Sequence, residues 1–152
     1  MNVKNPMLVV TDMEKSVAFY KQVCGLHVTM DFGANKTLRG GLVLQTLETW
    51  REFIGSDDIS FGGNSSEVYL EEDDFEAFAE KLKTCNVEYV HAVKEHSWGQ
   101  RVVRIYDPDR HIIEIGENIA AVCKRFFHGE MTPEQVAVRM DVPVEFVNEC
   151  LR

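Results

Sequence analysis

Residues 106–114 read YDPDRHIIE, and this stretch decides the fold. The proline fixes the first central dihedral of a tight turn, and the aspartate before it is favoured at turn entry. On either side, residues 100–106 and 112–116 are rich in β-branched and aromatic side chains, as strands usually are. The stretch therefore predicts a hairpin whose turn is Asp107–Arg110.

The hairpin closes a longer unit. Glu67–Glu71 alternates polar and apolar residues as a half-buried strand does. Asp73 is a residue type that caps helices, and the helix that follows is expected to run to about Thr84. Asn86 is expected to end it in the left-handed conformation, and a strand is expected at Val87–Val90. The unit is thus one strand, one helix and three strands.

The same order occurs earlier in the chain. A strand at Met7–Val10 precedes a helix from Met13 to about Val23, and strands are expected at residues 27–32, 36–39 and 41–46. Three pairs of matching landmarks share one offset of 61 residues: Asp12 and Asp73, Cys24 and Cys85, Gly25 and Asn86. One offset at three landmarks indicates an internal repeat. The predicted fold class is α+β, with two βαβββ modules.

The modules are expected at about residues 5–47 and 66–116 of one domain, residues 1–117. The connecting segment, 48–65, is long and aromatic, which favours a lid or binding element. The alternative is that its aromatic side chains pack one helical turn onto the edge of the sheet.

Residues 118–152 are predicted to form a helical tail. Apolar residues recur at helical spacing from Ile119, Thr132-Pro133 is a capped helix start, and Pro143 opens a last helix. Two short helices in succession are superficially like a helix-turn-helix, but the acidic residues of the tail outnumber its basic ones, which disfavours DNA binding. The tail is therefore expected to pack on the core or on a dimer partner.

Composition narrows the function. The formal net charge is −9, which argues against nucleic-acid partners and is compatible with a neutral or cationic ligand. No apolar run is long enough for a membrane span, and Met1–Asn5 does not resemble a secretory signal. The four cysteines have neither disulfide nor zinc spacing and indicate free thiols. A cytoplasmic location is expected.

Two stretches resemble one known family. Residues 10–20, VTDMEKSVAFY, and residues 106–114 are similar to the two conserved motifs of the vicinal oxygen chelate superfamily, the glyoxalase/bleomycin-resistance/dioxygenase type. The resemblance covers roughly residues 5–117. It implies paired modules that curve around a trough, a small-molecule site in that trough, and a homodimer. Arg110 stands where the family usually has glycine, which a type I turn would allow.

The resemblance also implies a set of metal ligands from the first and last strand of each module. Carried over by motif, the positions are Asn5, Gln45, Glu67 and Glu114. Asn5 and Glu67 replace the family's common histidine. Oxygen donors suit magnesium or manganese better than zinc or nickel, so a divalent metal of that class is the cofactor to consider.

Strand alternation puts Glu67 and Glu114 on the face that turns away from the helices, where two carboxylates could act as acid and base. Arg101 and Arg104 are three residues apart in one strand and are expected on opposite faces, so that only one of them enters the trough. The candidate ligand contacts are Trp50, Tyr69, His96, Trp98 and Arg104.

Three functions remain open. The first is a small-molecule-binding protein that holds a cationic or polyhydroxylated ligand in the trough of a homodimer. The second is a divalent-metal-dependent lyase or isomerase of the glyoxalase type that uses Glu67 and Glu114. The third is a non-catalytic regulatory module whose tail binds another protein.

Overall fold

A computed structural model describes all residues, 1–152, and the chain divides into two compact units. Unit 1 is residues 1–66 with 106–112, and unit 2 is residues 67–105 with 113–152. The architecture is α+β, with two four-stranded sheets and helices at the C-terminal end, as the sequence predicts. None of the helices has the length and apolar character needed to span a membrane.

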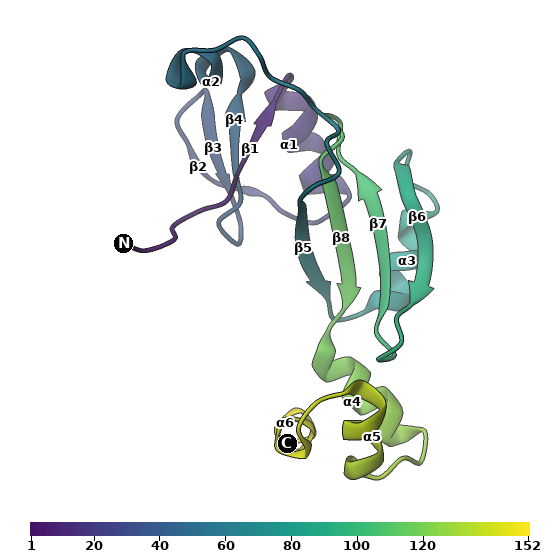
Figure 1. Ribbon diagram of the computed structural model, residues 1–152. Coiled ribbons are helices and arrows are strands. Elements are labelled where there is room, and N and C mark those ends of the chain that lie inside the picture. Colours follow the sequence, from purple (N-terminus) through teal and green to yellow (C-terminus); the bar gives the residue numbers. More distant parts are fainter. The chain divides into compact units, whose positions relative to one another are not determined.

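Unit 1 holds the first module, in which β1 pairs parallel to β4, and β3 pairs antiparallel to both β4 and β2. The sheet order is β1-β4-β3-β2, and Figure 1 shows α1 beside this sheet. The elements are β1 (Met7–Val10), α1 (Met13–Gln22), β2 (Val28–Asp31), β3 (Asn35–Leu38), β4 (Val43–Thr46) and α2 (Leu47–Ile54).

Helix α1 begins and ends where its sequence predicts. Asp12 is the N-cap, and its carboxylate accepts a hydrogen bond from the backbone N–H of Lys15 at 3.0 Å. Gly25 follows the helix with a φ of +70°, a conformation that glycine adopts without steric cost. Tyr20 is fully buried on the inner side of the helix.

The turn of the YDPDRHIIE hairpin belongs to unit 1 and is bonded to the start and the inner face of α1. The Tyr20 hydroxyl donates to the Asp107 carboxylate at 2.8 Å, and both groups are buried. Burial raises the pKa of the Tyr20 phenol, and the charge of Asp107 raises it further. Thr11 donates its backbone N–H and its hydroxyl to Asp109. The two motif stretches are therefore in direct contact.

Arg110 corrects one expectation about this turn. Its φ is +65°, so the residue is left-handed, which explains why glycine would suit the position. Asp107 N–H donates to His111 O, and Arg110 N–H donates to Asp107 O, which makes a three-residue loop with a left-handed last residue. The guanidinium of Arg110 lies 4.1 Å from the centre of the Tyr106 ring, a contact that helps to hold the strained residue.

The segment after β4 starts as a helix. Helix α2 has two turns, lies next to β4 and β1, and ends at Gly55 with a φ of +64°. Trp50 is half-buried in it, whereas Phe53 is exposed. The helix is longer than the single turn considered from the sequence, and whether the segment acts as a lid or binding element stays a prediction.

Unit 2 holds the second module and the tail. Its sheet order is β5-β8-β7-β6, with α3 on one face (Figure 1). Two details differ from the sequence-based expectation. The N-cap of α3 is Asp74 and not Asp73. Asn86 is not left-handed, because the chain leaves α3 through a turn at Lys83–Cys85. The elements are β5 (Glu67–Glu72), α3 (Phe75–Leu82), β6 (Glu88–Glu95), β7 (Arg101–Tyr106), β8 (Ile112–Glu117), α4 (Ile119–His128), α5 (Pro133–Met140) and α6 (Val144–Cys150).

The tail helices have a core of their own. Val122, Val136 and Val147, one from each helix, are fully buried together. Thr132 and Gln135 form a reciprocal capping box at the start of α5. All four cysteines are free thiols, and burial followed by the neighbouring Cys150 raises the pKa of Cys123 to about 12. Cys123 is therefore a core residue and a poor nucleophile at neutral pH.

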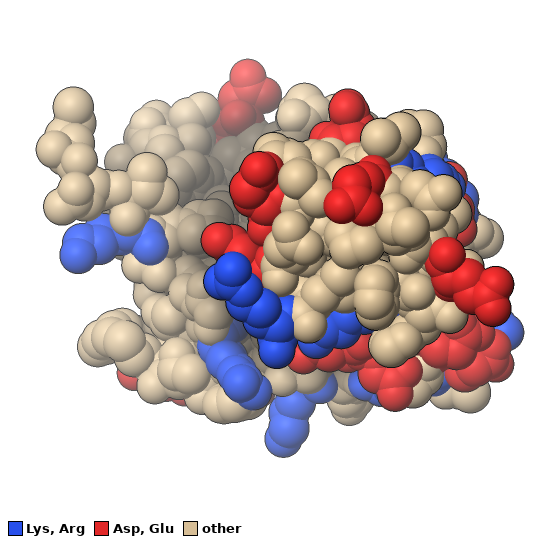
Figure 2. Space-filling model, turned by 90° about the horizontal axis from the view of Figure 1, so that it is seen from below, with Lys and Arg blue, Asp and Glu red and all other residues tan.

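Charged side chains of both signs occur on the face that Figure 2 shows. On the face shown in Figure 2, acidic side chains lie next to basic ones, with uncharged surface between them. This face therefore has no broad area of a single charge.

Candidate functional site

A row of four polar side chains crosses the sheet of unit 2, one from each strand. In strand order these are Glu67, Glu114, Arg104 and His91. The Arg104 guanidinium donates to both oxygens of Glu67, at 2.7 Å from Nε and 3.3 Å from Nη2. Its Nη2 also forms an ion pair with Glu114. Arg104 is thus shared between the two carboxylates that the sequence predicts to face each other.

His91 completes the row. Its Nδ1 lies 2.8 Å from the carbonyl oxygen of Ala92, so Nδ1 carries the hydrogen and Nε2 has a free lone pair. Arg104 Nη1 lies 3.2 Å from this Nε2 and donates to it. Every nitrogen of the guanidinium therefore has a partner. The side chain of Glu114 is only 8% exposed, so its charge depends on Arg104 for compensation.

The row lies on the face of the sheet that turns away from α3. Arg101, three residues before Arg104, points the other way and bonds Glu76 of α3 at 2.6 Å. Along β5, Glu67, Tyr69 and Glu71 are exposed, whereas the residues between them are half-buried. The alternation predicted from the sequence is therefore present, and Arg104, not Arg101, shares this face with Glu67.

A second group of side chains lies at the other end of the same face. Gln100 Nε2 donates to the Tyr69 hydroxyl at 2.8 Å, and Gln100 Oε1 accepts from Trp98 Nε1 at 3.2 Å. The ring of His96 is stacked on Trp98, with centroids 4.2 Å apart. Burial, followed by the positive charge of Arg104, lowers the pKa of His96, so its ring is neutral at pH 7. The group therefore presents aromatic area with polar edges.

Gly116 is required where Tyr69 crosses β8. A Cβ at this position would lie 2.9 Å from Tyr69 Cε2 and 2.9 Å from Gln100 Nε2, closer than real Cβ atoms come. The glycine thus allows the tyrosine ring to lie flat across the strand. Tyr69 and Trp98 stay partly exposed, at 45% and 38%, and can contact a ligand.

Sequence comparison identifies the family. The model of the glyoxalase-like domain family matches residues 3–120, which are most of the chain. The chain belongs to this family. Its place in the vicinal oxygen chelate superfamily follows, as the two motif stretches predict.

This glyoxalase-like chain is also similar to individual proteins in sequence and fold. The uncharacterized protein YraH of Bacillus subtilis (strain 168) is 31% identical over 120 residues, which cover 71% of this chain and 91% of YraH. A crystal structure of a protein of unknown function from Agrobacterium tumefaciens str. C58 is 32% identical, with a TM-score of 0.73, and covers 78% of this chain and 95% of its own. A glyoxalase-related enzyme from Fulvimarina pelagi shares the fold at 24% identity, with a TM-score of 0.65 and coverage of 77% and 88%.

The candidate residues of the first module have their own partners in unit 1. Asn5 is exposed, and its amide donates to Gly41 O at 2.7 Å. Gln45 is buried; its Oε1 accepts from Asn35 at 2.7 Å, and its Nε2 contacts the Thr49 hydroxyl. Six of the predicted residues lie on one face of unit 2, namely Glu67, Tyr69, His96, Trp98, Arg104 and Glu114. The other three, Asn5, Gln45 and Trp50, lie in unit 1.

The donor set of this glyoxalase-like chain does not fit a divalent metal. Both carboxylates are bound to a guanidinium, so a metal ion would have to displace Arg104 from Glu67 and Glu114. The Gln45 amide oxygen, a neutral and weaker ligand than a carboxylate, already accepts a hydrogen bond from Asn35. No group of three or more His, Cys, Asp or Glu side chains is placed to hold a metal.

Sequence reasoning missed two residues of the face. Gln100 links Tyr69 to Trp98, and His91 accepts from Arg104. The signal for Gln100 was its parity, because it lies four residues before Arg104, next to the start of β7, and so shares its face. His91 could not be placed because β6 runs five residues beyond its predicted end.

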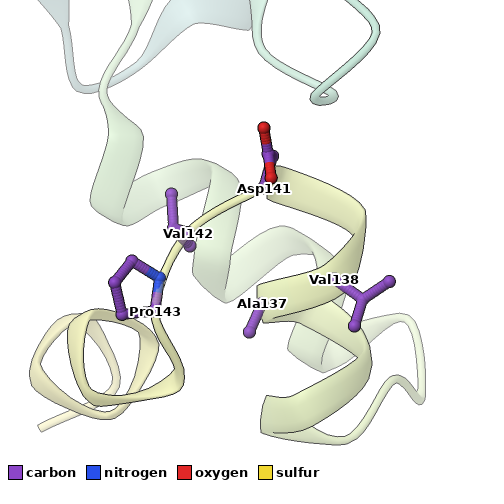
Figure 3. A pocket seen from close by; sticks show the side chains of 5 residues that line it. All are labelled: Ala137, Val138, Asp141, Val142 and Pro143. Atoms are coloured by element: carbon purple, nitrogen blue, oxygen red, sulfur yellow. The ribbon is translucent and has the colours of Figure 1, made fainter.

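The tail has a shallow groove of about 500 Å³, lined by α5 and the segment that joins it to α6. Figure 3 shows the five lining side chains, of which only Asp141 is charged. Val138 at its rim is 84% exposed. The groove contains none of the predicted site residues.

Proposed function

We propose that this glyoxalase-like protein binds a small molecule on the polar face of unit 2 without a resident divalent metal. The observation that carries the proposal is Arg104, whose guanidinium donates hydrogen bonds to Glu67 and forms an ion pair with Glu114, the two carboxylates that would otherwise be metal ligands. A fixed cation on two fixed carboxylates also leaves neither Glu67 nor Glu114 free to act as the base of a lyase or isomerase.

The chemistry of the face favours a cationic ligand that carries hydroxyl groups. The row holds two carboxylates against one guanidinium, so its acidic side chains outnumber its arginine. Trp98 offers an aromatic face for a cation, and the Tyr69 hydroxyl and the partly exposed carboxylate of Glu67, whose oxygens keep further lone pairs, can bond hydroxyl groups. The formal charge of the chain, −9, attracts such a ligand at long range.

Trp98 fluorescence tests the proposal directly. In a Trp50→Phe background, the protein is titrated with an amino sugar, a polyamine and a quaternary ammonium ion, and with a neutral sugar and a carboxylate as controls. We expect saturable quenching by a cationic probe and about tenfold weaker binding in Glu67→Gln, which removes a charge-assisted contact. Saturation by the carboxylate alone would contradict the proposed ligand class.

The metal-dependent lyase or isomerase is tested by metal analysis. Protein purified without chelator is expected to contain no stoichiometric metal and to bind no Mn²⁺ at micromolar concentration. Removing the guanidinium in Arg104→Met frees two carboxylates and the His91 nitrogen, and we expect this variant to gain Mn²⁺ binding. Stoichiometric metal in the wild type that is lost in both Glu67→Gln and Glu114→Gln would refute the metal-free site and support the enzyme instead.

We further propose that the protein is a homodimer, which the family resemblance implies. Light scattering coupled to size-exclusion chromatography tests it. A mass of twice 17.4 kDa is expected, and a mass equal to that of one chain would refute the dimer.

A further inference from the structure

The tail binds the turn that joins β6 to β7. Arg125 Nη2 donates to the carbonyl oxygen of Gly99 at 2.6 Å, and Arg139 bonds the carbonyl of Ser97 and the carboxylate of Glu95, the latter at 2.9 Å. All these residues belong to unit 2. Two arginines from two tail helices therefore hold one short turn through its backbone.

Phe126 fits against the same turn. A Cβ at Gly99 would lie 2.2 Å from Phe126 Cζ, so the ring is packed on the glycine backbone. The guanidinium groups of Arg125 and Arg139 lie 4.8 and 5.1 Å from the centre of this ring. The φ of Gly99 is +91°, a conformation that only glycine adopts readily. The packing is thus tight, and it needs both the glycine and the aromatic ring.

The turn carries the stacked rings of His96 and Trp98. Two backbone hydrogen bonds close it, from His96 N–H to Gln100 O and from Gly99 N–H to His96 O, each at 2.8 Å. The arginines bond the carbonyl groups of Ser97 and Gly99, the residues on either side of Trp98. A change in the tail therefore changes the backbone from which the indole ring projects.

We infer that the C-terminal tail is a positioning element for the binding face, in which Arg125, Phe126 and Arg139 fix the turn that presents Trp98. The family match ends at residue 120, so these three residues lie beyond it. The inference rests on the proposed function only in taking Trp98 as a ligand contact. A turn fixed in advance lowers the entropic cost of ligand binding.

Arg139→Ala tests the inference with Trp98 itself as the probe. In the Trp50→Phe background, the variant is compared with its parent by acrylamide quenching and by emission wavelength. We expect a quenching constant about twofold higher and a red-shifted emission, because the turn opens locally. Arg152→Ala, which removes the same charge from the tail at a residue without a side-chain contact to the turn, is the matched control and should match the parent.

A second measurement uses the single variant Arg139→Ala, because the double variant Arg125→Ala/Arg139→Ala loses both arginine contacts and could lose part of its fold. Hydrogen exchange at the Gly99 amide is read by NMR in the single variant Arg139→Ala, whose far-UV circular dichroism should equal that of the parent. We expect exchange about tenfold faster at Gly99, with the amides of β8 unchanged. Arg139→Lys, which keeps one donor, should restore part of the protection.

The inference is overturned if Gly99 exchange and Trp98 quenching in Arg139→Ala equal those of the parent. Both measurements are made without a ligand. A failure of the cationic probes to bind would therefore refute the proposed function and leave the positioning role standing. Unchanged exchange and quenching in Arg139→Ala, with the probes still bound, would refute the positioning role and leave the proposed function standing.

Discussion

At the scale of single residues, Arg104 determines what the binding face can do. A buried carboxylate without a partner is costly, and Glu114 is one of the least exposed acidic side chains of the chain. The guanidinium compensates its charge and that of Glu67 while bonding His91 in a fixed direction. A metal ion and an arginine are alternative solutions to the same electrostatic problem, and this chain has the arginine.

Replacing this arginine should therefore destabilise the protein. Arg104→Met leaves two carboxylates facing each other, one of them buried, and we expect a loss of about 3 kcal/mol in the free energy of unfolding. Urea denaturation at pH 7 measures it. Lys94→Met, which removes a positive charge from an exposed position of β6, should change the free energy little. Equal stabilities of the two variants would contradict the role given to Arg104.

Glu117 should make the stability pH-dependent. Although burial opposes it, hydrogen bonds from Arg125 and Arg101 lower the pKa of Glu117 in the folded state. A lowered folded pKa means that the contribution to stability is fully present above the unfolded pKa, about 4.3, and is lost as the pH falls through the folded value. Urea denaturation between pH 7 and pH 3 should show a smaller acid-side loss in Glu117→Gln than in the wild type.

Loss of the same carboxylate should also lower stability at pH 7. Removing one partner from a buried ion pair costs about 3 to 5 kcal/mol. Glu72→Gln changes the same chemistry at a partly buried position of β5 and is the control. A Glu117→Gln variant whose stability follows the wild-type pH profile would show that Glu117 is not the group responsible.

At the scale of elements, the decisive contact is between α1 and the hairpin turn. Tyr20→Phe removes the hydroxyl that bonds Asp107 and leaves a buried carboxylate with one partner fewer, so a loss of about 1 to 3 kcal/mol is expected. Thermal unfolding and urea denaturation measure it. Tyr89→Phe, in which the ring is partly exposed on β6, is the matched control and should leave the stability unchanged. Equal losses in both variants would exclude a specific role of the Tyr20 hydrogen bond.

The elements also show how far sequence reasoning reaches. The hairpin and the order of one strand, one helix and three strands in each module were predictable because turn residues and alternation act locally. Two of the three landmark pairs that gave the 61-residue offset do not match in the structure, because Asp74 caps α3 and Asn86 is not left-handed. The left-handed Arg110 depends on the three-residue loop between Asp107 and His111, and the end of α3 on the turn at Lys83–Cys85, and neither turn type was distinguished from the sequence. On the binding face, alternation placed Glu67 and Glu114 on the correct side. Alternation could not reveal that Arg104 of β7 hydrogen-bonds Glu67 and forms an ion pair with Glu114, because the sequence of one strand does not determine its register with its neighbours.

At the scale of the whole molecule, the tail is a separate hydrophobic core within unit 2. Val147→Ala removes two methyl groups from the centre of this core, and we expect a loss of about 2 kcal/mol in the stability of the tail. Hydrogen exchange should then rise together over α4, α5 and α6. Val138→Ala removes the same atoms from a side chain that is 84% exposed and should leave exchange unchanged. A uniform effect over the sheet of unit 2 as well would mean that tail and sheet unfold as one.

The turn of the second hairpin lies in the same compact unit as the first sixty-six residues, although its two strands belong to the other unit. The two sequence repeats therefore do not coincide with two independent structural units. A gene split between the repeats would encode an amino-terminal fragment in which the Tyr20 hydroxyl of α1 lacks its acceptor, Asp107. In the carboxy-terminal fragment, the hairpin turn would lack its hydrogen bonds to Thr11 and Tyr20. Such fragments are expected to be unstable when produced singly and to recover structure when they are co-expressed.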